Sequence, residues 1–385
     1  MKLLIHDLTK EEWDKVSASY EGWEVICDNG CIKSCVGCFG CWIKEPGECV
    51  IKDGYEKMGA LIHKADEVTV ISRYTYGGFS SFIKNVFDRS IGFVLPYFEI
   101  RKGEMHHKKR YPEDKPMTFI FRGRDLTDDD KNCARKYVEA VCTNLHGIVK
   151  DVVFEETSTT KDLAEKMPYI QSDDTTILLN CSLRGDKANS KMFLDYLESG
   201  LEGEVKRINL STYINQTDEL VRIFASAKKI VLSIPLYVDG IPSSTLRMME
   251  RIEQCSLKDS KKIYVIANMG FYESVQITNL MSMVRNWCDR CGFEYGGGVA
   301  IGAGEMVGSM MVSSYAKKGP SKNAALSLDK LSETINASSV MDDIYSDPFK
   351  FPRALYMFCA NSGWPVGCKK NGLKRKDLLR KADAD

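Results

Sequence analysis

The first 155 residues alternate short apolar runs with amphipathic stretches. The apolar runs have the length and composition of buried strands, and they cover residues 2–6, 24–27, 67–72, 117–121 and 148–154. Between them, apolar residues recur every three or four positions, which predicts helices that include residues 10–16, 55–64, 82–93 and 128–146. Such alternation is typical of a parallel sheet with helices on both faces.

The second half repeats this organisation after a polar stretch, residues 155–174, whose periodicity is weak. Strands are predicted at residues 176–180, 205–210, 229–235, 262–268 and 299–302, with helices between them and a last helix near residues 323–335. We therefore expect an α/β protein with two tandem doubly wound domains, residues 1–155 and 175–338, each with a five-stranded parallel sheet. Residues 339–385 form a tail too aromatic to be disordered, which we expect to pack between the domains or onto another subunit.

Composition limits the classes of function. Lysine plus arginine and aspartate plus glutamate both total 53, so no overall field attracts nucleic acid or an anionic membrane. The apolar run at the N-terminus is too short for a signal peptide, and no stretch approaches the roughly 18 apolar residues of a membrane span. We expect a soluble cytoplasmic protein whose 14 cysteines are reduced or metal-bound.

A cysteine-rich loop follows the predicted strand at residues 24–27. Its residues Cys35, Cys38, Cys41 and Cys49 have the spacing C-x2-C-x2-C-x7-C, which is typical of metal ligands. Glycines between the cysteines permit the sharp curl that would bring four thiolates to one point. On spacing alone, a 4Fe-4S cluster, a structural zinc ion and uncoordinated thiols packed as small apolar groups all stay open.

A second candidate site follows the strand predicted at residues 176–180. Ser182, Arg184, Asn189 and Ser190 supply hydroxyl, guanidinium and amide groups just before a helix begins, where backbone N–H groups are also available. This set suits a phosphate monoester, whereas a solvated turn with a serine or asparagine cap is the alternative. The lysine-threonine ending of a nucleotide-hydrolysing loop and the G-x-G-x-x-G fingerprint are both missing, which favours a mononucleotide such as FMN.

Two further loops follow the strands predicted at residues 229–235 and 262–268, at the sheet edge where doubly wound folds bind ligands. An isoalloxazine ring needs a face to stack on and edge donors from backbone N–H groups. The candidate residues in these loops are Pro235, Leu236, Tyr237, Asp239, Gly240, Asn268, Met269, Gly270 and Phe271. Taken singly, each loop also suits an ordinary turn with a half-buried tyrosine.

These loops carry a resemblance to a known family. The pattern S-x-R-x-x-x-x-N-S from residue 182, with SIPLYVDGIPSS and NMGFYE, resembles the FMN-binding loops of the NADPH-dependent FMN reductase branch of the flavodoxin-like superfamily, although Cys181 stands where the family usually has glycine. In the first half, CVGCFGCWIKEPGECVIKD, ISRYTYGGFSSFIKNVFDR and GEMHHKKRY resemble flavodoxin-family proteins allied to iron-sulfur flavoproteins. The resemblance implies FMN, reduction by a nicotinamide nucleotide, and a homodimer.

The first half departs from the family where its phosphate loop should be. The turn after residues 2–6 reads HDLTKEE, which lacks the Ser-x-Arg pattern and presents carboxylates that would repel a phosphate dianion. We therefore assign FMN to the second domain.

The expected function is an FMN-dependent oxidoreductase that passes electrons from NAD(P)H to an unidentified small-molecule or protein acceptor. Flavin reduction needs no side-chain nucleophile or acid, so no catalytic residue is named. A non-catalytic electron carrier that combines the flavin with an iron-sulfur cluster, and a flavin-free interaction scaffold, are the alternatives.

Overall fold

The computed structural model describes residues 1–157, 168–311 and 315–382. The chain forms two compact units, one made of Met1–Thr160 with Ala354–Asp385 and the other of Lys161–Arg353. Half of the polar stretch at residues 155–174, namely residues 158–167, lies outside the described residues.

The first unit is built on a five-stranded parallel sheet in the order β2-β1-β3-β6-β7. Its strands are β1 (Lys2–His6), β2 (Glu24–Cys27), β3 (Glu67–Arg73), β6 (Lys115–Gly123) and β7 (Gly147–Glu156). This is the order of a flavodoxin-like sheet. The second strand pairs with one side of the first strand, and the later strands add on its other side.

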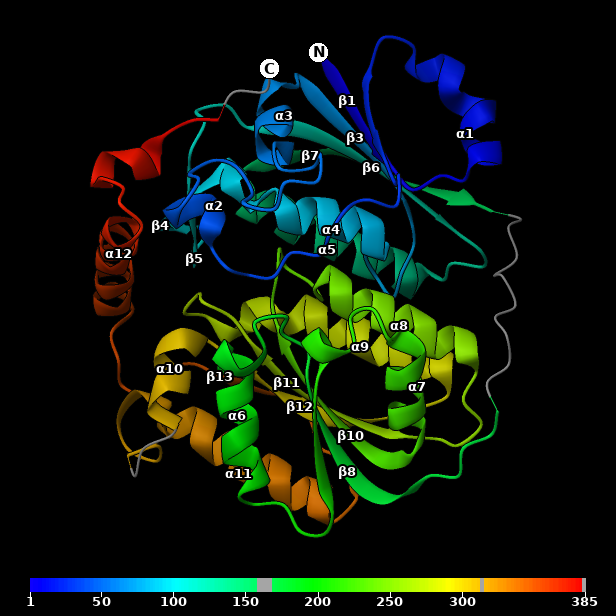
Figure 1. Cartoon of the computed structure of the whole chain (residues 1–385), viewed down its shortest axis with the longest axis vertical. Helices are drawn as coiled ribbons and strands as arrows, with labels where there is room; N and C mark the ends of the chain where they lie inside the picture. The colour runs from blue at the N-terminus through cyan, green and yellow to red at the C-terminus, as the bar shows by residue number, and fades with distance from the viewer. Residues whose placement is uncertain (158–167, 312–314, 383–385) are drawn as a thin grey trace. The chain divides into compact units, whose positions relative to one another are not determined.

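Helices α1 (Lys10–Val16), α3 (Met58–Lys64), α4 (Ser81–Arg89) and α5 (Asp128–Asn144) connect these strands, and a short helix α2 (Gly40–Ile43) lies inside the cysteine-rich loop (Figure 1). Residues 94–109, for which no strand was predicted, form an antiparallel hairpin of β4 (Val94–Arg101) and β5 (Glu104–Lys109). Phe98 and His107 pair across it as buried side chains.

The second unit contains a parallel sheet in the order β13-β12-β11-β10-β8-β9. The strands are β8 (Asp173–Asn180), β9 (Val205–Asn209), β10 (Ala227–Pro235), β11 (Lys262–Asn268), β12 (Glu294–Ile301) and β13 (Ile344–Ser346). Without β13, this is the flavodoxin-like order of the first unit. The sheet thus has six strands where five were predicted, because three residues of the expected tail pair with Val299, Ala300 and Ile301 of β12.

Two layers of helices cover this second sheet (Figure 1). Helices α7 (Thr217–Ala225), α8 (Ser243–Cys255) and α9 (Thr278–Cys291) pack side by side, whereas α6 (Asn189–Glu198) packs against α10 (Gly304–Met311) and α11 (Lys322–Asn336). Residues 230–232 and 263–267 in the two central strands are fully buried, which is expected of a sheet covered on both faces. Among the described residues, no helix has the length and apolar content needed to cross a membrane.

The C-terminal helix α12 (Arg353–Lys370) packs on the first unit, as do the residues that follow it. Trp364 meets the rings of Phe39 and Trp42 edge to face, with centroids 5.6 and 5.2 Å away. Asn361 accepts a hydrogen bond from the Phe98 amide at 2.7 Å and donates to the Phe98 carbonyl at 3.2 Å. The end of the chain therefore contributes to the surroundings of the cysteine-rich loop.

Candidate functional site

The three predicted cofactor loops of the second unit begin side by side. Strands β8, β10 and β11 are parallel neighbours, so their carboxyl ends meet at one edge of the sheet. The Cys181 amide donates to the Ser233 carbonyl at 2.9 Å, and the Leu236 amide donates to the Asn268 carbonyl at 2.8 Å. These bonds continue the ladders into the loops and fix where each loop leaves the sheet.

A buried hydrogen-bond chain joins the first loop to the third. The Asn268 amide group donates to the Ser190 hydroxyl at 3.0 Å, and the Ser233 hydroxyl donates to the Ser190 carbonyl at 2.9 Å. Ser190 and Asn268, predicted separately, therefore belong to one arrangement in which each is at most 5% exposed. A buried network with satisfied members holds loop ends rigidly.

The N-terminus of α6 has the features of an anion site. Its N-cap is Ala188, whose side chain cannot cap the helix, so the amide groups of the first turn receive no side-chain acceptor there. Ser182 accepts from the Arg184 amide at 3.3 Å and is 2% exposed, whereas the Arg184 side chain is exposed. In the described part of the chain, nothing accepts the hydroxyl hydrogen of Ser182 or Ser190, so both can donate to an anion.

The second loop contains a tight turn. Tyr237 and Gly240 exchange two backbone hydrogen bonds of 3.1 and 3.0 Å across Val238 and Asp239, which have φ of 39° and 58°. The turn leaves Pro235, Leu236 and Tyr237 half-buried at the edge, whereas Asp239 is 2% exposed. Only the half-buried part of the loop is therefore available to a planar ligand.

The third loop also has both buried and accessible residues. Met269 and Phe271 are 6% and 7% exposed and belong to the core. Gly270 is exposed, and a Cβ atom at this position would have no neighbour within 4 Å. Open space beside a backbone segment is what a ring edge needs in order to approach N–H groups closely.

Helix α10 completes the surroundings of this edge and was not predicted. The Ala303 and Gly304 amides donate to the Phe271 and Met269 carbonyls at 2.6 and 2.7 Å. A Cβ on Gly308 would lie 3.4 Å from that of Asn189, so glycine permits α10 to approach the start of α6. The signal in the sequence is the four-residue spacing of Gly304 and Gly308, which places both on one helix face.

The corresponding edge of the first unit is filled by the chain itself. Both carboxylate oxygens of Asp7 accept from the Arg73 amide at 3.0 Å. Burial raises the pKa of Asp7, while the Ser80 hydroxyl and Arg73 act in the opposite direction. Helix α1, the counterpart of α6, begins with a capping box in which Thr9 and Glu12 satisfy each other's amides. A carboxylate and a cap thus replace the open donors found in the second unit.

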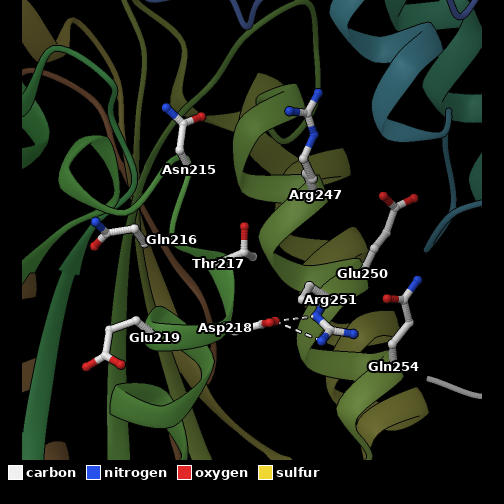
Figure 2. A pocket seen from close by; sticks show the side chains of 9 residues that line it. All are labelled: Asn215, Gln216, Thr217, Asp218, Glu219, Arg247, Glu250, Arg251 and Gln254. Atoms are coloured by element: carbon white, nitrogen blue, oxygen red, sulfur yellow. Dashed lines mark hydrogen bonds and ion pairs between the residues drawn. The ribbon is translucent and has the colours of Figure 1, made fainter. Parts of the chain in front are cut away.

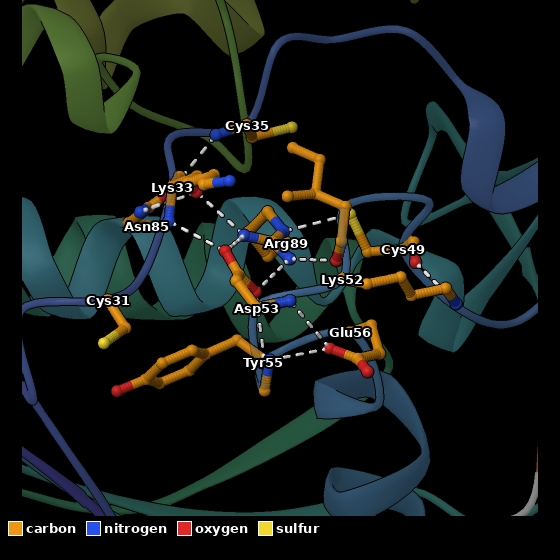
Figure 3. Close-up of polar contacts among 12 residues, drawn as sticks. Cys31, Lys33, Cys35, Cys49, Lys52, Asp53, Tyr55, Glu56, Asn85 and Arg89 are labelled. Carbon is orange, nitrogen blue, oxygen red and sulfur yellow. Dashed lines mark hydrogen bonds and ion pairs between the residues drawn. The ribbon is translucent and has the colours of Figure 1, made fainter.

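The cysteine-rich loop of the first unit is held by a buried arginine on α4. Arg89 is 2% exposed, and all of its donors are used (Figure 3). It binds both oxygens of Asp53 at 2.9 Å, the carbonyls of Lys33 and Ile51 at 2.8 and 2.9 Å, and the sulfur of Cys49 at 3.0 Å. Both ends of the loop therefore converge on one guanidinium.

The four predicted metal ligands do not form a metal site in the described residues. No group of three or more histidine, cysteine, aspartate or glutamate side chains there is arranged to hold a metal ion. Burial raises the pKa of Cys41 well above its usual value, and charge on Cys35, Cys49 or Cys38 would raise it further. Burial, followed by Asp88, raises the pKa of Cys35 to about 12. Burial therefore favours the protonated form of both thiols, and the arrangement of the described side chains gives the predicted metal site no support.

No family model matches the chain, and no curated protein matches it. Among solved structures, the chain is similar to an FMN-dependent NADH-azoreductase from Bacillus anthracis str. Ames Ancestor in complex with FMN. The two sequences are 16% identical, the match covers 43% of this chain and 100% of that chain, and the TM-score is 0.34. An azoreductase from Bacillus anthracis str. Sterne has 14% identity, the same coverage of both chains and a TM-score of 0.31. An NAD(P)H:quinone oxidoreductase from Methanothermobacter marburgensis has 11% identity, coverage of 52% and 97%, and a TM-score of 0.21. These likenesses are too weak to carry a functional assignment, so the function proposed below rests on the site itself.

Proposed function

We propose that the chain is an FMN-dependent oxidoreductase that uses one flavin, held at the carboxyl edge of the second sheet. The supporting observation is the contrast between the two units at equivalent positions. The start of α6 offers uncapped amides and the hydroxyls of Ser182 and Ser190, whereas Asp7 and the Thr9–Glu12 cap fill that position in the first unit. Phosphate binds helix N-termini whose donors are free.

The residues at this edge fit the parts of FMN. Ser182, Ser190, Asn189 and the guanidinium of Arg184 would hold the phosphate, because all four lie at the first turn of α6 or in the loop before it. Tyr237 and the open backbone at residue 270 would border the ring. When bound, FMN supplies hydride acceptance and one- or two-electron transfer. The chain itself orients the flavin and excludes water from its buried edge.

The cosubstrate would be NADH or NADPH, and the acceptor a small molecule or another protein. Anaerobic addition of NADPH or NADH to the purified protein tests this directly. Rapid loss of the flavin absorbance near 450 nm is the expected result. A flavin that only dithionite reduces would point to an electron carrier, and protein that neither carries nor takes up FMN would point to a scaffold.

An iron-sulfur cluster on Cys35, Cys38, Cys41 and Cys49 is a separate proposal, which rests on the C-x2-C-x2-C-x7-C spacing of the four residues. Iron and acid-labile sulfide in anaerobically purified protein would test it, and their absence would leave four uncoordinated thiols. A homodimer is proposed on the family resemblance, and sedimentation of the full chain is the test.

A further inference from the structure

A polar cavity of about 530 Å³ lies between α7 and α8 in the second unit. Residues 215–219, at the start of α7, form one wall, and Arg247, Glu250 and Gln254 of α8 contribute to the other (Figure 2). Helix α8 begins directly after the loop 236–242, which is proposed to border the flavin ring. Helix α8 therefore runs from the proposed flavin loop to the wall of the cavity.

In the first unit, the cysteine-rich loop covers the part of α4 that corresponds to the cavity wall on α8. Helix α4 follows a turn between Thr75 and Gly78 that has the same paired backbone bonds as the turn between Tyr237 and Gly240. Counted from the glycine that ends each turn, Asn85 and Arg89 of α4 correspond to Arg247 and Arg251 of α8.

Asn85 and Arg89 bind the cysteine-rich loop, through the Cys35 amide and the Lys33 carbonyl among other groups. In the second unit, the segment between β9 and α7 spans only residues 210–216, so this crossover contains no loop comparable to the cysteine-rich one. The cavity is the space that the shorter crossover leaves uncovered.

The charges in the cavity indicate the kind of ligand it suits. Arg251 pairs with Asp218 at 2.8 Å, and Glu219 pairs with Arg222 at 3.4 Å. Arg247 is exposed and has no hydrogen-bond or ion-pair partner within the described ranges. A guanidinium without a partner binds phosphate well, and carboxylates and carboxamides accept from ribose hydroxyls and bind base edges.

We infer that this cavity binds the adenosine phosphate half of the nicotinamide nucleotide, with Arg247 on a phosphate group. The inference rests on the proposed function, because it takes the nucleotide as the cosubstrate whose other half reaches the flavin. The volume is in the range of pockets that hold small ligands.

The test uses probes that lack the nicotinamide ring, so that binding is measured without flavin chemistry. Calorimetric titration of the full FMN-loaded chain with ADP-ribose and with 2′-phospho-ADP-ribose compares wild type, Arg247→Gln and Arg290→Gln. Arg290 lies on α9 outside the cavity and pairs with Glu253. Arg247→Gln is expected to weaken at least one probe by tenfold or more, because one charge-assisted hydrogen bond contributes about that factor. Arg290→Gln is expected to leave binding unchanged.

Each result decides the inference. A preferred probe that loses its advantage in Arg247→Gln supports it and identifies the nucleotide as phosphorylated or not. Wild-type protein that binds neither probe, or Arg247→Gln that binds as wild type does, overturns it. Because Arg247 is exposed, the variant is expected to fold, and an unchanged melting temperature with unchanged FMN content confirms this. If the probes bind through Arg247 but neither nucleotide reduces the flavin, the nucleotide site stands and the proposed function falls.

Discussion

Replacement of Arg89 by methionine should strongly destabilise the first unit. Methionine keeps much of the length of the side chain but removes every donor. It leaves the carboxylate of Asp53, whose side chain is 4% exposed, and the carbonyls of Lys33 and Ile51 without their partner. Breaking a buried ion pair in this way costs about 3 to 5 kcal/mol. For a unit of this size, each kcal/mol lowers the melting temperature by roughly 2 to 4 °C, so we expect a fall of about 6 to 20 °C.

Arg251→Met is the matched control, because Arg251 occupies the equivalent position in the second unit. Its partner Asp218 is 62% exposed, and a pair of this kind contributes about 0 to 1 kcal/mol. Differential scanning calorimetry of both variants and of wild type compares the two positions. Equal, small shifts for Arg89→Met and Arg251→Met would refute the conclusion that Arg89 holds the cysteine-rich loop in place.

Three further predictions concern the loop before α6, the C-terminal helix α12 and the carboxylate of Asp53. Arg184→Ala should weaken FMN binding about 10- to 100-fold, the effect of one charge-assisted hydrogen bond to a phosphate. Lys187→Ala, in the same loop, should change the affinity for FMN little. Fluorescence titration of the apoprotein measures both variants, and equal affinities would remove Arg184 from the site. Trp364→Ala should destabilise the chain by about 1 to 3 kcal/mol through lost contacts with two aromatic rings, and an unchanged urea midpoint would show that α12 does not stabilise the first unit. Burial raises the pKa of Asp53, but hydrogen bonds from Arg89 and from amides outweigh it and hold the pKa below its usual value. The contribution of Asp53 to the free energy of unfolding is therefore complete above the unfolded pKa of about 4, and it is lost as the pH falls through the lower folded pKa. The urea midpoints of wild type and Asp53→Asn should therefore converge as the pH is lowered from about 6 to about 3, and a constant difference would contradict this.

The positions of the strands, and which loops share an edge of the second sheet, could be predicted because they depend on local pattern and on parallel pairing. The five apolar runs of each half became the five strands of a flavodoxin-like order, and the loops after β8, β10 and β11 meet at one edge because parallel neighbours must end together. The bond between Ser190 and Asn268 could not be predicted, since it joins residues that are far apart in the sequence and depends on side-chain direction.

Other features were missed because they depend on tertiary partners. The strand β13 has only three residues and no pattern of its own, so it exists only through pairing with β12. The role of Arg89 was equally hidden, because an arginine at the end of an amphipathic helix is usually solvated. Its burial follows from the length of the cysteine-rich loop, which brings acceptors from residues 33, 51 and 53 back to one helix face.

The difference between the two sheet edges is the central claim, and flavin stoichiometry tests it most directly. Apoprotein is reconstituted with excess FMN, freed of unbound flavin, and analysed for FMN per chain, with Ser190→Asp as a variant that places a carboxylate at the start of α6, as in the first unit. The account predicts one FMN per chain in wild type and a large loss in the variant, because a carboxylate there repels the phosphate. Two FMN per chain, none, or an unchanged content in Ser190→Asp would contradict it.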